Sequence, residues 1–442
     1  MKFKLLNVSP KLGRFGMISD VERIPSFSLE TPNVLFFTKK GCVPHLTCDV
    51  MQMISTDSLA LQFPLNNIFH CCEVLEKNKI SLNSFVGLPE YFSYCFCQDP
   101  VDSIPQGYHR GASATIWSTQ GKVFVPKERY MEIMEAFQPD MYCALSDGDT
   151  NFKSSTKRLC NSTSITNDAF QYCYDKHISS KLKNKGLIAP IEGGYDKSLR
   201  ERCVNHMTKF PVTGYLIDGL YTDGKTVNDI PFESVKEIVQ HTTNLLPSDK
   251  LRIIHGAWNP KSVVEMVKMG VDLFDTSFPY FMTENGWALV FNYNIENLLR
   301  DEVDLYENCA MRFDDDKNSS DKPSENPEKK NSDKPSVEPE KKNSDKPLYI
   351  SLHDTKYFDD LTPILNKCNC LACKNHTKSY IHHLLVTKEL LAPVLLTIHN
   401  MHHYLQFFAK IRENLKKKSQ NGVMTNGDIS KHLNGEVSKI QI

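Results

Sequence analysis

Residues 186–220 read GLIAPIEGGYDKSLRERCVNHMTKFPVTGYLIDGL, and this stretch predicts the fold. The apolar run GLIAPIEGG precedes a helical segment, DKSLRERCVNHMTK, which leads into a second apolar run, TGYLIDGL. Buried strands that alternate with helices are typical of parallel βαβ units. The same alternation extends on both sides, with apolar runs at 141–147, 251–258 and 271–279 and helical segments between the later ones.

The number of these units favours a (β/α)8 barrel, the TIM-barrel class of α/β fold. A doubly wound sheet is less favoured, because no glycine-rich phosphate fingerprint follows any of the strands. Residues 1 to about 140 are harder to interpret. There we expect a strand in NVLFFTKKG, a hairpin in SATIWSTQGKVFVP, and a helix in PKERYMEIMEAF that starts at Pro126.

Acidic residues stand at or near the ends of four predicted strands: Asp147, Glu192, Asp218 and Asp275. Barrel enzymes collect their catalytic groups at the C-terminal ends of the strands. Acids also cap helix N-termini, so for Asp147 and Asp218 a capping role remains an alternative. For Glu192, which precedes two glycines, and for Asp275, we favour a role in a binding pocket.

Three cysteines in the run KCNCLACKNH, Cys368, Cys370 and Cys373, precede a long amphipathic helix that carries His399. Three thiolates and one imidazole form the tetrahedral set that structural zinc prefers. Unrelated thiols of a reduced protein are the alternative, since the chain has 14 cysteines. Spacing alone leaves other histidines open as fourth ligand: His376, His382, His383, His402 and His403.

The helix around His399 has apolar residues at helical spacing. We expect them to cover either the chain's own barrel or a partner; they are Val394, Leu395, Ile398, Met401, Leu405, Phe408, Ile411 and Leu415.

The chain is nearly neutral, with 52 basic and 53 acidic residues, and 40% of its residues are hydrophobic. This balance excludes a globally polycationic nucleic-acid binder and leaves a local basic face open. The cysteines lack the framework of a small secreted domain, and no apolar run is long enough to span a membrane. We therefore expect a soluble cytoplasmic protein, with peripheral membrane attachment left open.

Residues 311–347 break the pattern, because EKKNSDKP occurs at 328–335 and again at 340–347. Such a polar composition predicts a disordered insertion. The expected organisation is a barrel domain at 1–310, the insertion at 311–347, a zinc-binding segment that completes the barrel at 348–415, and a disordered tail at 416–442.

With these motifs in place, the sequence resembles the tRNA-guanine transglycosylase family. It matches the family's zinc signature, Cys-x-Cys-x-x-Cys with a histidine 26 positions after the last cysteine, and this spacing selects His399. VKMGVDLFDTSFP resembles the nucleophile strand, GYLIDGL the Gly-Gly-Leu strand and APIEGG the Gln-Gly strand. The resemblance implies a barrel with a C-terminal zinc-binding helical subdomain and one structural zinc ion per subunit.

The family exchanges guanine at the tRNA wobble position for a deazaguanine base, which is queuine in eukaryotes. By resemblance, Asp275 occupies the position of the carboxylate that attacks ribose C1′. Asp147 or its neighbour Ser146 would face the purine edge, and Glu192, Gly219 and Leu220 would surround the base.

The sequence departs from the family pattern at several of these positions. Two arginines that would hold RNA are replaced by Phe281 and Glu284, and a negative charge beside phosphates opposes binding. Glu192 and Asp218 stand where the catalytic pattern has Gln and Gly. The region SYCFCQDPVDSIPQGYHRG lacks the Gly-Gly loop, although it offers the acids Asp99 and Asp102. We therefore expect a vestigial site.

An intact scaffold with altered site residues predicts a subunit without activity of its own. The resemblance implies a heterodimer with a catalytic subunit that exchanges guanine for queuine in tRNAs with GUN anticodons, and tRNA contact through that complex. It also permits peripheral association with the mitochondrial outer membrane. One alternative is an independently active transglycosylase that uses Asp275, and another is a zinc-stabilised RNA-binding adaptor.

Overall fold

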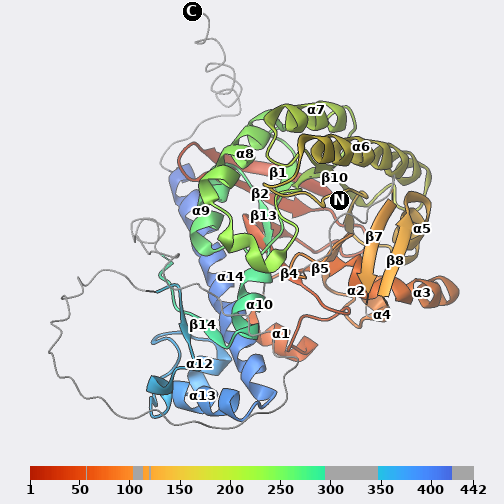
Figure 1. Ribbon diagram of the computed structural model, residues 1–442. Helices are drawn as coiled ribbons and strands as arrows, with labels where there is room; N and C mark the ends of the chain where they lie inside the picture. The colour runs from red at the N-terminus through yellow and green to blue at the C-terminus, as the bar shows by residue number, and fades with distance from the viewer. Residues whose placement is uncertain (56, 103–112, 119–120, 294–346, 421–442) are drawn as a thin grey trace, which may run out of the picture.

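The computed structural model describes residues 1–293 and 347–420, except for residues 56, 103–112 and 119–120. Eight parallel strands form a closed barrel at its centre (Figure 1). In spatial order they are β10 (Gly186–Ile191), β11 (Gly214–Ile217), β12 (Leu251–Ile253), β13 (Leu273–Asp275), β4 (Asn33–Phe37), β5 (Ala60–Pro64), β6 (Phe92–Phe96) and β9 (Met141–Cys143). The predicted (β/α)8 barrel is confirmed.

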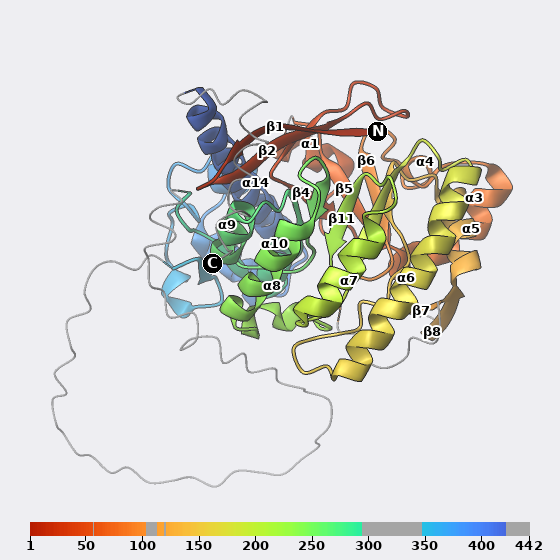
Figure 2. The ribbon, with the colours of Figure 1, turned by 90° about the horizontal axis from the view of Figure 1, so that it is seen from above.

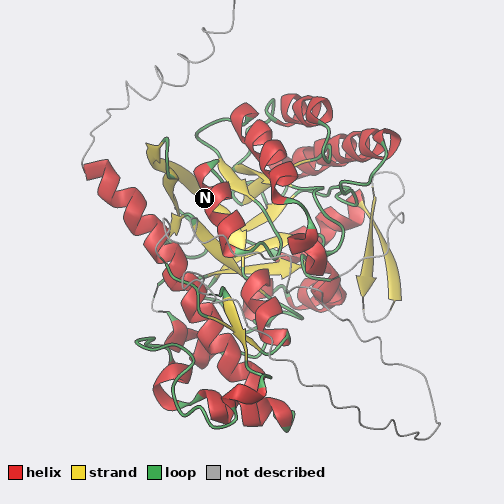
Figure 3. Ribbon diagram, turned by 60° about the vertical axis from the view of Figure 1, so that its left-hand side comes forward, coloured by secondary structure: helices red, strands yellow, loops and turns green. Residues whose placement is uncertain are grey.

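Helices surround the barrel and bury one face each against the strands (Figure 3). Side-chain caps start three of them: Ser155 accepts from the backbone N–H of Arg158, Asp196 from that of Leu199, and Asn259 from that of Ser262. The barrel helices are α5 (Lys127–Phe137), α6 (Thr156–Ser179), α7 (Lys197–Met207), α8 (Phe232–Leu245), α9 (Pro260–Lys268) and α10 (Ser277–Glu284). Shorter helices are α1 (Cys48–Ile54), α2 (Leu65–Ile68), α3 (Cys72–Asn78) and α4 (Leu82–Phe85), with 3-10 turns η1 (Phe69–Cys71), η2 (Gly224–Asp229) and η3 (Thr355–Tyr357).

An N-terminal antiparallel sheet covers the end of the barrel where the strands begin (Figure 2). It consists of β1 (Lys2–Ser9), β2 (Gly13–Ser19) and β3 (Leu29–Thr31), and the sequence did not predict it. Ile18 and Leu29 from this sheet join the core inside the barrel. Arg14 on β2 donates to the buried carboxylate of Asp272, with 2.7 Å between Nε and Oδ1. The N-terminal sheet is thus fixed to the barrel by both apolar packing and a buried ion pair.

All five strands predicted between 141 and 279 are shorter than the apolar runs that predicted them. β9 ends at Cys143, and β12 ends at Ile253. After β9 the backbone forms hydrogen bonds outside the barrel sheet. The N–H of Asp147 donates to the hydroxyl of Thr166 on α6, at 3.0 Å. Ala144 and His255, just beyond these two strand ends, line the cavity at the C-terminal end of the barrel.

The hairpin and the helix after it follow the prediction. β7 (Ser113–Ser118) and β8 (Gly121–Pro126) pair antiparallel, and α5 begins directly after Pro126. Residues 119–120, between the two strands in the sequence, are outside the described residues.

The C-terminal segment adds no strand to the barrel. A two-stranded sheet of β14 (Trp287–Leu289) and β15 (Tyr349–Ser351) leads into α12 (Leu371–Asn375), α13 (Lys378–Val386) and α14 (Leu391–Gln420). α14 runs from the zinc segment along the barrel, where it packs on α10, β4 and the N-terminal sheet (Figure 1). Its expected apolar stripe is buried there except for Val394 and Leu405, which are partly exposed. The stripe therefore covers the chain's own barrel.

The predicted domain boundaries are only partly visible. α14 continues to Gln420, five residues beyond the expected end at 415. The expected insertion spans 311–347, and all of it except residue 347 lies outside the described residues. The tail from 421 to 442 lies outside them as well. Within the described part of the chain, no helix is long and apolar enough to cross a membrane.

Candidate metal centre and barrel mouth

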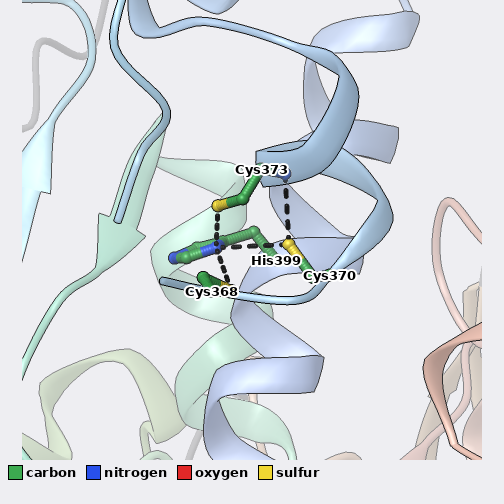
Figure 4. A group of neighbouring side chains, drawn as sticks. All are labelled: Cys368, Cys370, Cys373 and His399. Atoms are coloured by element: carbon green, nitrogen blue, oxygen red, sulfur yellow. Dashed lines mark hydrogen bonds between the residues drawn. The ribbon is translucent and has the colours of Figure 1, made fainter. Parts of the chain in front are cut away.

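The four predicted zinc ligands converge on one point (Figure 4). Nδ1 of His399 lies 3.8 Å from Sγ of Cys368, 3.6 Å from that of Cys370 and 3.3 Å from that of Cys373. Around zinc, with Zn–S of about 2.3 Å and Zn–N of about 2.0 Å, tetrahedral ligand atoms lie roughly 3.5–3.8 Å apart. The cluster can therefore hold one metal ion, and its soft ligand set fits structural zinc.

Local structure orients each ligand. Cys370 is the N-cap of α12, and its sulfur accepts from the backbone N–H of Cys373 at 3.3 Å. Nε2 of His399 donates to the carbonyl of Leu289 on β14, at 2.8 Å, so that Nδ1 carries the lone pair that faces the sulfurs. Hydrogen bonds of this kind fix the tautomer of metal-binding histidines.

Several competing histidines are engaged elsewhere. Nδ1 of His382 is 2.8 Å from the carbonyl of Leu352, and Nδ1 of His403 is 2.9 Å from the hydroxyl of Tyr293. The ring of His376 stacks on Tyr380. Among the described residues, His399 alone joins the three cysteines in a metal-type cluster.

Asp275 ends β13 at the barrel mouth, the C-terminal end of the barrel, and only 1% of its surface is exposed. Its carboxylate accepts from the backbone N–H of Gly256 and that of Ser277, both at 2.8 Å. Burial raises the pKa of Asp275 to about 6, against these hydrogen bonds, which lower it. The group is therefore largely ionised at neutral pH and held by two donors.

Asp147 is engaged by an arginine that sequence reasoning did not single out. Arg158, on the first turn of α6, binds both carboxylate oxygens of Asp147 at 2.8 and 2.5 Å. Asp147 is 1% exposed, and the hydroxyl of Ser162 bonds its carbonyl at 2.6 Å. Asp147 does not cap α6, whose N-cap is Ser155, and Arg158 occupies both of its carboxylate oxygens.

Glu192 and Asp218 are neighbours at the ends of β10 and β11. Glu192 is fully buried, and no donor from the described residues reaches either of its carboxyl oxygens. Burial and then Asp218 raise the pKa of Glu192 well above its ordinary value, and burial also raises that of Asp218. We infer that Glu192 is protonated and can donate to Asp218.

The backbone after β11 fits tightly around this pair. Gly219 has φ of +72°, and a Cβ there would lie 2.3 Å from Oε2 of Glu192, so only glycine fits. The buried Leu220 follows, and its carbonyl accepts from the hydroxyl of Tyr195 at 3.0 Å. Arg200, buried beneath, donates to the carbonyls of Ile191 and Asp218 at 2.8 and 2.6 Å.

A second acidic pair lies on the loop after β6. Asp99 is buried and accepts from Asn67 at 2.7 Å, and Asp102 lies 3.3 Å from Nζ of Lys39. Burial and then Asp102 raise the pKa of Asp99 to about 6. Both acids line the barrel mouth, and the rest of the predicted loop, at 103–112, lies outside the described residues.

The two positions where the family pattern has arginine offer no positive charge. Phe281 is 5% exposed, with its ring edge-on to Trp287, and Glu284 is at the surface, 2.7 Å from Nε2 of His45. α10 therefore presents an aromatic core residue and an acid at these positions.

Asp275→Asn should stabilise the protein increasingly as the pH rises. A carboxyl with a raised folded pKa favours folding below the unfolded pKa, near 3.8, and loses that contribution as the pH rises through about 6. The shift of about two units corresponds to about 3 kcal/mol. We expect the gain in unfolding free energy from the substitution to be about 2 kcal/mol larger near pH 7.5 than near pH 4.5.

Denaturant unfolding at the two pH values measures this gain, and the loss of an accepted hydrogen bond cancels in the comparison. Asp249→Asn, at a site with 75% of the side chain exposed, is the control. An equal effect of Asp275→Asn at both pH values would refute the raised pKa.

Comparison with known proteins agrees with the fold and the metal cluster. The family model described as queuine tRNA-ribosyltransferase matches residues 11–426. This match covers nearly the whole chain, including the closed barrel and the Cys3His cluster. The protein belongs to the queuine tRNA-ribosyltransferase family.

Similar curated proteins carry a narrower name, queuine tRNA-ribosyltransferase accessory subunit 2. The one from Gallus gallus is 35% identical over 409 residues, which cover 91% of this chain and 92% of the relative. The one from Culex quinquefasciatus is 34% identical over 442 residues, covering 99% and 92%. The one from Aedes aegypti is 32% identical over 420 residues, covering 94% and 90%.

Proposed function

We propose that this chain is the non-catalytic subunit of a heterodimeric queuine tRNA-ribosyltransferase. In this proposal it supports a catalytic subunit that exchanges guanine for queuine at the wobble position of tRNAs with GUN anticodons. The names of its relatives support an accessory role, and family membership supports the reaction.

The observation that carries the non-catalytic assignment is the chemistry around Asp275. Asp275 keeps a carboxylate at the end of β13, but Glu192 and Asp218 add acid groups at the ends of β10 and β11 on the same end of the barrel, and α10 supplies no arginine to hold phosphates. A nucleophile without groups that bind substrate is poorly equipped for turnover. Independent catalysis by Asp275 is the second candidate, because the residue is ionisable and lies at the C-terminal end of a barrel strand.

We assign zinc to the Cys3His cluster, with one structural ion held by Cys368, Cys370, Cys373 and His399. The four ligands are all supplied by the chain, which is typical of closed structural sites. The ion would hold α12 against α14 and, through His399, against β14.

The subdomain around this cluster also supports an interface. Four of its apolar residues are largely exposed: Phe358 (75%), Leu361 (75%), Val386 (62%) and Leu390 (84%). Exposed apolar side chains that gather on one surface are typical of a protein contact, and the ring of Phe358 lies 6.5 Å from that of His382, one turn before Val386 on α13. We call these four residues the zinc-subdomain patch and propose that it contacts the catalytic subunit, with tRNA bound by the complex.

Substitution of this patch tests the partner assignment. We expect Phe358→Asp combined with Leu390→Asp to weaken the complex with the catalytic subunit about tenfold or more, because charge would be buried at an apolar contact. Ile178→Asp, at a site 53% exposed on α6, is the matched control. Binding can be measured by titration with the purified partner; unchanged affinity of a folded, metal-loaded double variant would remove the patch from the interface.

We further propose a cytoplasmic location. All described cysteines are free thiols, which suits a reducing compartment. Peripheral association with the mitochondrial outer membrane, the disordered insertion and the disordered tail remain predictions.

A further inference from the structure

The barrel mouth contains buried polar atoms that lack partners. Asn66, from α2, and His255, from the loop after β12, are 5% and 6% exposed, and both line the cavity at the mouth. Neither Oδ1 of Asn66 nor Nε2 of His255 has a hydrogen-bond partner among the described residues. Buried polar atoms are nearly always paired, so this arrangement indicates that something else bonds to them.

The charged side chains that line this cavity are all acidic. Asp99, Asp102 and Asp218 line it together with Oδ1 of Asn66, and burial lowers the pKa of His255 to about 3, which keeps its ring neutral. Lys39 pairs with Asp102 and also attracts Asp99, and Arg158 is occupied by Asp147, so the charge of Asp218 is not offset by Lys39. An occupant should therefore carry positive charge and several donors.

The size and geometry of the cavity limit the class of ligand that it can hold. The cavity has a volume of about 50 Å³, room for roughly three to five water molecules and well below the 300 Å³ or more of typical small-molecule sites. Within the described chain, the Cys3His cluster is the one group close enough to hold a metal ion, so the mouth acids do not form a metal site. A small organic cation fits both limits.

Aromatic lining favours a planar cation. Phe96 and Tyr221 line the same cavity, and the ring of Phe96 packs 4.3 Å from that of His255. A guanidinium is weakly hydrated, stacks on aromatic faces and presents donors in one plane. We propose that the barrel mouth binds a guanidinium group, with Asp218, Asn66 and His255 as its acceptors. Because Ser146 and Asp218 of the vestigial base pocket line this cavity, the proposal rests on the proposed non-catalytic role.

The test titrates the full chain with methylguanidinium and, in parallel, with methylurea, a neutral molecule of nearly the same shape. We expect saturable binding of methylguanidinium alone by calorimetry or ligand-observed NMR. Asp218→Asn keeps the shape and removes the charge, and should raise the dissociation constant about tenfold or more. Asp229→Asn, an exposed acid outside the cavity, should leave it unchanged.

Asn66→Ala provides a second variant if Asp218→Asn fails to fold, and it should also weaken binding. Equal binding of methylurea, absence of saturable binding, or unchanged affinity of both variants would overturn the proposal. Repeating the titration with the catalytic subunit bound identifies the source of the group. Retained binding points to a diffusible guanidine, and lost binding to an arginine side chain of the partner.

Discussion

Cys370→Ala should release the metal ion and unfold the C-terminal segment. The variant removes a buried sulfur that faces His399 at 3.6 Å and also caps α12. Structural zinc contributes about 10–16 kcal/mol in small zinc-binding peptides, which is as much as the whole stability of many domains. No substitution elsewhere in the chain is expected to cost more.

The loss should reach the barrel, because the ligand helix is tied to it. Asn400, next to His399, accepts from the N–H of Leu289 at 2.9 Å and donates to the hydroxyl of Thr283 on α10 at 3.0 Å. A free His399 imidazole would loosen these bonds. We therefore expect the whole protein, and not only α12, to melt at lower temperature.

Zinc content by elemental analysis, together with thermal unfolding, measures both effects. Cys42→Ala, which removes an exposed thiol, is the matched control and should retain one zinc ion and the wild-type melting temperature. Unchanged zinc content and melting of Cys370→Ala would show that the cluster is not a structural metal site.

The barrel and the metal ligands were predictable because their signals are local. Apolar runs between 141 and 279 each correspond to one strand, and the cysteine spacing brings three sulfurs to one turn. His399 was selected by the resemblance, and its position against Leu289 gives the physical reason.

The remaining features depend on contacts between distant segments. β1 alternates partly and fully exposed residues, so its sequence shows no buried run, and β6, FSYCF, is too short to be told from a loop. The pairing of Asp147 with Arg158 depends on how the chain folds between β9 and α6, which the sequence pattern does not indicate. The contact of Glu192 with Asp218 depends on the register of β10 and β11, in which Ile191 pairs with Ile217.

The central claim is that this chain supports base exchange without performing it, and guanine exchange into a tRNA with G at the wobble position tests it most directly. The assay compares this chain alone, the chain with the catalytic subunit, and that complex with Asp275→Ala in this chain. We expect no exchange by the chain alone and full exchange by the complex. We expect the same full exchange by the complex with Asp275→Ala, because removal of a vestigial carboxylate leaves the partner's site unchanged.

The difference between the first two arms should span several orders of magnitude, as expected when a nucleophile lacks its substrate-binding groups. Equal exchange by the complex with and without Asp275 would agree with the accessory role. Exchange by this chain alone that disappears in Asp275→Ala would contradict it and establish a working active site.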